Sequence, residues 1–203
     1  MRSARLLKVA WLSILLGIGM ELLLLATAAF FGKNPVLKPV LADLAQKISW
    51  SFIICTGIAL GTVASKMKAP AMGIAGFAGA PLAFTAAKAL HKSVAEAMAI
   101  AAPAAGVPSP FALAGIKALQ YALLGILLSR FEQKPQPRLT PHLIVGAVIG
   151  ALFGGWILWL VVQQSPNPVP LAALVTRGIN EILFPIGCSA VVGATRQVST
   201  RTR

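Results

Sequence analysis

The sequence predicts an all-α integral membrane protein, a single domain over residues 1–203 that crosses the bilayer with six transmembrane helices. Composition is the first reason, because 57% of the residues are hydrophobic and only 11% are charged. An ordinary soluble domain carries about 25% charged residues, so that class is excluded. The second reason is that six apolar runs, separated by polar or proline-rich stretches, are each close to the roughly 20 residues that a spanning helix needs.

Charge placement is the third reason. The chain has 18 Lys and Arg against 5 Asp and Glu, a net charge of +13, and the cations gather at the ends of the apolar runs. This pattern is typical of a polytopic membrane protein, so we expect a lipid bilayer as partner and no nucleic acid. Outside the predicted spans, eleven basic residues fall on the side of both termini and five on the other. The excess predicts cytoplasmic termini, in a bacterial inner membrane or another energy-coupling membrane.

The predicted spans are residues 9–31, 48–65, 70–90, 111–128, 142–162 and 170–194. Two short helices are expected between them. Residues 36–47 are amphipathic and either lie on the membrane surface or extend the next span. Ser93 and Glu96 match a capping box, which predicts the start of a short alanine-rich helix that stops near Gly106.

Glycines recur at four-residue spacing in two of the spans. Gly57 and Gly61 form one such pair, and Gly146, Gly150 and Gly154 form two overlapping pairs. Small residues at this spacing allow another helix to approach closely. The ridge at residues 146–154 most simply packs against a helix of the same chain, and a second copy or another membrane subunit is the alternative.

The last span contains the strongest functional signal. Arg177, Asn180 and Glu181 are three and four residues apart inside it, so they share one face of the helix. A charge near the bilayer centre costs about 2.5–3.5 kcal/mol on insertion scales, so such residues usually face protein or water and often mark function. The residues therefore predict a buried polar site.

Two other spans supply charges at similar depths. Glu21 lies near the middle of the first span, and Lys117, Gln120 and Tyr121 share one face of the fourth. At 1.5 Å per residue, Glu21 and Glu181 lie about 15–16 Å from the outer boundary of the membrane, and Lys117 and Arg177 lie about 10 Å from it. We expect Glu21, Lys117, Arg177 and Glu181 to form an electroneutral cluster, with Glu21 bonded to Arg177 or Lys117.

This cluster has two interpretations. In one, the charges only hold three helices together. In the other, at least one pair opens when a proton or substrate takes a partner's place, as in transporters. The leading hypothesis is a small transporter or channel-like protein that handles an ion, a proton or a small polar solute. The alternative is a non-catalytic structural or assembly subunit of a larger membrane complex.

No catalytic motif is present, so we expect no enzyme and no cofactor. Cys55 and Cys188 belong to no metal-spaced cluster and are expected to pack as small hydrophobes, so no metal is predicted. The four tryptophans, among them Trp50, are expected to anchor the helices at the membrane interface or to contact lipid, without a role in ligand binding.

Overall fold

The computed structural model of the chain is all-helical over the residues that it describes, which are 2–33, 36–64, 67–100, 108–132 and 138–201. Six helices make up this part of the chain: α1 (Arg2–Phe30), α2 (Leu37–Ala64), α3 (Lys68–Ala97), α4 (Pro110–Glu132), α5 (Leu139–Gln164) and α6 (Leu171–Arg201). Each contains a stretch long and apolar enough to cross a membrane. The prediction of an all-helical fold with six such helices is confirmed.

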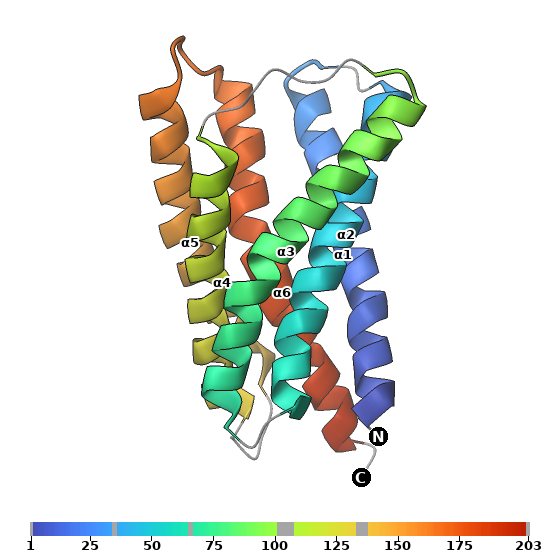
Figure 1. Ribbon diagram of the computed structural model, residues 1–203, viewed down its shortest axis with the longest axis vertical. Helices are drawn as coiled ribbons and strands as arrows, with labels where there is room; N and C mark the ends of the chain where they lie inside the picture. The colour runs from blue at the N-terminus through green and yellow to red at the C-terminus, as the bar shows by residue number, and fades with distance from the viewer. Residues whose placement is uncertain (1, 34–35, 65–66, 101–107, 133–137, 202–203) are drawn as a thin grey trace.

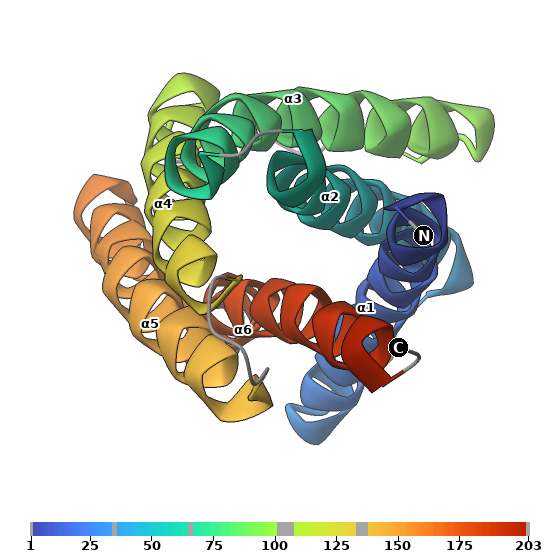
Figure 2. The same ribbon diagram turned by 90° about the horizontal axis from the view of Figure 1, so that it is seen from below.

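The helices run up and down in chain order, so that both termini lie at the same end of the bundle (Figure 1). Seen from that end, α1, α2 and α3 form one side and α4 and α5 the other (Figure 2). Helix α6 packs against α1, α2, α4 and α5, which places it between the two sides. A charged residue on α6 therefore has several helices within reach.

Small side chains lie inside the bundle, and many large apolar side chains lie on its surface. On α5, Gly146, Gly150 and Gly154 are buried, while large apolar residues such as Leu152 and Trp159 are exposed, at 63% and 56%. A soluble helix would place its large apolar residues inside and polar ones outside. Small residues inside and large apolar ones outside suit a lipid surround.

The separate amphipathic helix predicted at residues 36–47 is wrong, because α2 is one continuous helix from Leu37. The polar residues of this segment face other helices rather than a membrane surface. Lys47 pairs with Glu21 of α1, and Asp43 pairs with His91 of α3. Because both charges have partners on neighbouring helices, the segment extends the span.

The second short helix is also wrong within the described residues, since α3 continues through Ser93 to Ala97. Glu96 pairs with Lys92 one turn earlier, at 3.7 Å, instead of capping a new helix. The helix ends where Ala99 takes a φ of 53° and the amide of Ile100 donates to the carbonyl oxygen of Ala95. The remainder of the predicted helix, residues 101–106, lies outside the described residues.

Glycines set the distance between helices at several crossings. A methyl group at Gly150 would come within 2.5 Å of the carbonyl oxygen of Ile182, and one at Gly146 within 2.7 Å of the Cα of Ile186. Gly61 meets the backbone of α3 in the same way, whereas Gly57 leaves ordinary contact space. The ridge on α5 therefore lies against α6 of the same chain.

Candidate functional site

The centre of the candidate site is an ion pair between Lys117 of α4 and Glu181 of α6. The Lys117 ammonium donates to Oε2 of Glu181, and each side chain is only 9% exposed. Both residues lie well inside helices that could span a membrane, away from the helix ends. The pair is thus a charged contact in the apolar interior of the bundle, where charges are stable only with partners.

Two aromatic rings complete the surroundings of the ammonium. The Lys117 Nζ lies 5.8 Å from the ring centroid of Trp50 and 6.0 Å from that of Tyr121. The two rings meet edge to face, with centroids 5.8 Å apart. Aromatic faces attract cations, most strongly where water is excluded. The ammonium is therefore held by a carboxylate and by two ring systems from α2 and α4.

Gln120 is the polar residue next to Lys117 along the same face of α4. Its side chain is fully buried, and neither its amide nitrogen nor its amide oxygen has a hydrogen-bond partner among the described residues. A buried amide without partners costs about 1–3 kcal/mol in proteins. Gln120 therefore offers a free donor and a free acceptor one turn from the ion pair.

Helix α5 packs closely against one side of Glu181. A methyl group at Gly154 would come within 3.1 Å of the Cβ of Glu181, a tight contact, so the glycine lets α5 approach Glu181 closely. The α5 ridge and the carboxylate of α6 thus belong to one contact. The glycine spacing of α5 and the buried charge of α6, two separate patterns in the sequence, therefore meet at one contact between helices.

Glu21 forms a second, separate pair with Lys47 of α2. Lys47 Nζ lies 2.6 Å from Oε2 of Glu21, and the two side chains are 14% and 5% exposed. The expected bond from Glu21 to Arg177 or Lys117 is therefore wrong.

The reason for this pairing is the way α1 and α2 approach each other. Gly17 leaves no room for a methyl group against the backbone of Ile48, and the Ser51 hydroxyl donates to the carbonyl oxygen of Ser13 at 2.6 Å. This contact brings the first half of α2 onto α1, one turn from Glu21. Lys47 is therefore the cation that lies next to the Glu21 carboxylate.

Arg177 and Asn180 are half-buried on α6 and make no side-chain hydrogen bond or ion pair within the described residues. Arg177 lies one turn before Glu181, but Glu181 is paired with Lys117. Three of the four predicted charges are thus in two separate ion pairs, Glu21 with Lys47 and Lys117 with Glu181, and Arg177 is in neither.

The sequence did not indicate one member of these pairs, Lys47, or one neighbour of the Lys117–Glu181 pair, Trp50. Residues 36–47 are expected on the membrane surface or as an extension of the next span, with no partner given for Lys47. Trp50 is expected at the membrane interface or in contact with lipid, whereas it is only 9% exposed and contacts the site. The sequence contains a signal for Lys47, because Glu21 lies in an apolar span and needs a cationic partner. Trp50 lies one turn from Lys47 along the same helix. The other three tryptophans are at least partly exposed.

Lys117 and Glu181 can each bind a group other than the other residue of the pair. The Glu181 carboxylate can accept a proton or a cation, the Lys117 ammonium can bind an anion, and Gln120 can hydrogen-bond to either. No group of three or more metal-ligating side chains occurs among the described residues. Comparison with protein families, with curated proteins and with solved structures finds no match, so the function must be argued from this geometry alone.

Proposed function

We propose that the protein is inserted in a membrane, with cytoplasmic termini, and works as a small transporter or channel-like protein. In this proposal the Lys117–Glu181 pair opens to handle an ion, a proton or a small polar solute. The observation that carries the proposal is a charged pair inside two candidate spans, one turn from a fully buried amide that has no hydrogen-bond partner in the described part of the chain.

The energetics favour a working pair over a purely structural one. Replacing a buried ion pair by apolar residues of similar volume is often neutral or stabilising by about 1–4 kcal/mol. If the only role of the pair were to hold α4 against α6, apolar residues such as leucine at these two positions would do so equally well. Ionisable residues inside spans are instead typical of proton relays and substrate sites.

The proposed cycle begins with a proton or cation arriving at Glu181. Its arrival neutralises the carboxylate and releases Lys117, whose ammonium stays beside Trp50 and Tyr121. The freed ammonium and the Gln120 amide then offer a site for an anionic or polar group. Departure of that group and of the proton restores the pair.

The test is flux through the purified protein in lipid vesicles. Proton entry is followed with trapped pyranine under a potassium diffusion potential, and swelling is followed in isosmotic urea, glycerol and glycine. At least one flux should exceed that of empty vesicles, and Glu181→Gln should abolish it or change its pH dependence. Glu96→Gln is the matched control, because Glu96 is 65% exposed near the end of α3.

Vesicles that show no flux above the empty control in any of these assays would contradict the proposal. The alternative function, a subunit of a larger membrane complex, is tested on the same preparation. It requires a companion polypeptide that co-purifies at fixed stoichiometry in mild detergent. A monodisperse preparation of this chain alone, with flux sensitive to Glu181→Gln, would exclude it.

A further inference from the structure

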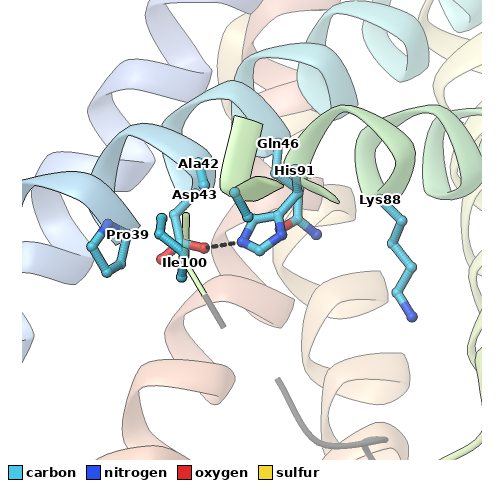
Figure 3. A pocket seen from close by; sticks show the side chains of 8 residues that line it. Pro39, Ala42, Asp43, Gln46, Lys88, His91 and Ile100 are labelled. Atoms are coloured by element: carbon cyan, nitrogen blue, oxygen red, sulfur yellow. Dashed lines mark ion pairs between the residues drawn. The ribbon is translucent and has the colours of Figure 1, made fainter. Parts of the chain in front are cut away.

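The end of the bundle opposite the termini holds an open pocket of about 420 Å³ between α2 and α3. Figure 3 shows this α2–α3 pocket from close by. Its polar lining consists of Asp43 and Gln46 from α2 and of Lys88 and His91 from α3. Its apolar lining consists of Pro39, Ala42, Ala95 and Ile100. The pocket lining thus includes both charged and apolar side chains.

The charges around the pocket do not cancel. His91 Nε2 lies 3.2 Å from Oδ1 of Asp43, and this contact is the dashed line in Figure 3. Lys88 extends away from Asp43, and its ammonium lies 4.8 Å from the ring centroid of Phe84. Among the described residues Lys88 pairs with no carboxylate, so its charge is uncompensated.

A second cation reinforces this excess. Lys38, one residue before Pro39, donates from Nζ to the carbonyl oxygen of Met98 at 3.5 Å, which ties the start of α2 to the end of α3. Lys92 and Glu96 pair with each other one turn further along α3 and neutralise each other. Two lysines therefore stand against a single carboxylate, and that carboxylate already has His91 as its partner.

We propose that the α2–α3 pocket binds a small organic anion, one carboxylate or phosphate group attached to a short apolar chain. The anionic group lies beside the Lys88 ammonium, which donates a charge-assisted hydrogen bond to it. The apolar chain lies against Ala95 and Ile100. A free solute and a lipid headgroup share this chemistry, and the experiment below separates them.

The pocket is also linked by contacts to the buried pair. Phe84, which lies beneath the Lys88 ammonium, meets Trp50 edge to face with centroids 6.5 Å apart. Trp50 in turn contacts Lys117. The inference concerns binding and holds whether or not the protein transports. With the proposed transport function, this is the place where an anion first meets the protein.

Binding is measured by calorimetry on the full chain in nanodiscs of phosphatidylcholine, with hexanoate and hexyl phosphate as probes. Saturable binding is expected for at least one of them and none for hexylammonium. Lys88→Met should weaken it about tenfold, since a hydrogen bond to a charged group is lost. The matched control is Lys92→Met, on the same helix and 76% exposed, which should leave affinity unchanged.

A lipid headgroup is tested by comparing nanodiscs with and without phosphatidylglycerol. If the lipid is the source, the anionic lipid raises the melting temperature of the wild type and of Lys92→Met, but not of Lys88→Met. Absence of both probe binding and lipid stabilisation would overturn the proposal. An equal effect of the two lysine substitutions would overturn it as well. Neither readout depends on flux, so this failure is distinguishable from that of the transport proposal.

Discussion

Lys117 and Glu181 depend on each other for their stability in the core. Each is an ionised group in an apolar bundle, and removal of one partner leaves the other buried without compensation. Such a loss costs about 3–5 kcal/mol, far more than the contact itself contributes net. The consequence is a marked asymmetry between single and double substitutions.

We predict that Lys117→Met lowers the free energy of unfolding by about 3–5 kcal/mol, and that adding Glu181→Gln restores most of the loss. The measurement is reversible unfolding in mixed micelles of the wild type, both single variants and the double variant. Additive effects of the two substitutions would show that the side chains do not interact.

The Glu21–Lys47 pair should behave differently although its distance is short. Lys47 is 14% exposed and has a long side chain that can reach toward the nearest helix end when its partner is removed. We predict that Glu21→Gln costs less than Lys117→Met and leaves flux unchanged. The two variants are compared in the same unfolding and vesicle assays. A loss of flux in Glu21→Gln would mean that both pairs belong to one functional cluster.

At the scale of helices, glycine positions determine how closely charged helices approach. Gly150 lies against the backbone of α6, whereas Gly155 on the same helix faces open space. Because the contacted atoms of Ile182 belong to the backbone and not to the end of a flexible side chain, a methyl group at Gly150 must push the helices apart.

We therefore predict that Gly150→Ala destabilises the protein by about 1–3 kcal/mol, the usual cost of overpacking. Gly155→Ala should be neutral or slightly stabilising, because alanine is the better helix former. Thermal unfolding of the two variants in the same detergent is the comparison. Equal effects would place the α5 ridge away from α6.

Helices were predictable from the sequence and their partners were not. Apolar run length alone located all six, because lipid-compatible helices need long uninterrupted hydrophobic segments. Their ends were missed where a charged residue has an interhelical partner, as with Lys47 and Asp43 in α2. A pattern read along one helix carries no information about the neighbour that neutralises a charge.

The same limit applies to the candidate site. Lys117 and Glu181 stood out because charges inside apolar runs are costly, and the structure joins them. Depth along the helix could not show which rotational face each residue takes, so Glu21 was assigned to the wrong partners. Trp50 was misplaced for a related reason. It lies near the start of the predicted span 48–65, where an aromatic ring suits both the interface and the core, whereas in the structure it lies in the middle of α2.

At the scale of the whole molecule, the up-and-down order of six helices places both termini on one side. We predict that a reporter active only in the cytoplasm is active when fused after Arg203 and inactive when inserted at Asn167, between α5 and α6. The excess of basic residues on the side of the termini is the physical reason. Activity reversed between the two positions would invert the proposed orientation.

The central claim is that the Lys117–Glu181 pair takes part in transport and does not only hold α4 to α6. The most direct measurement is vesicle flux in the double variant Lys117→Met with Glu181→Gln, which nearly keeps the volume of both side chains and removes both charges from the α4–α6 contact. Our account predicts a protein that folds, inserts and unfolds at near wild-type temperature but shows no flux above empty vesicles. Wild-type flux in this variant would contradict the account and reduce the pair to a structural contact.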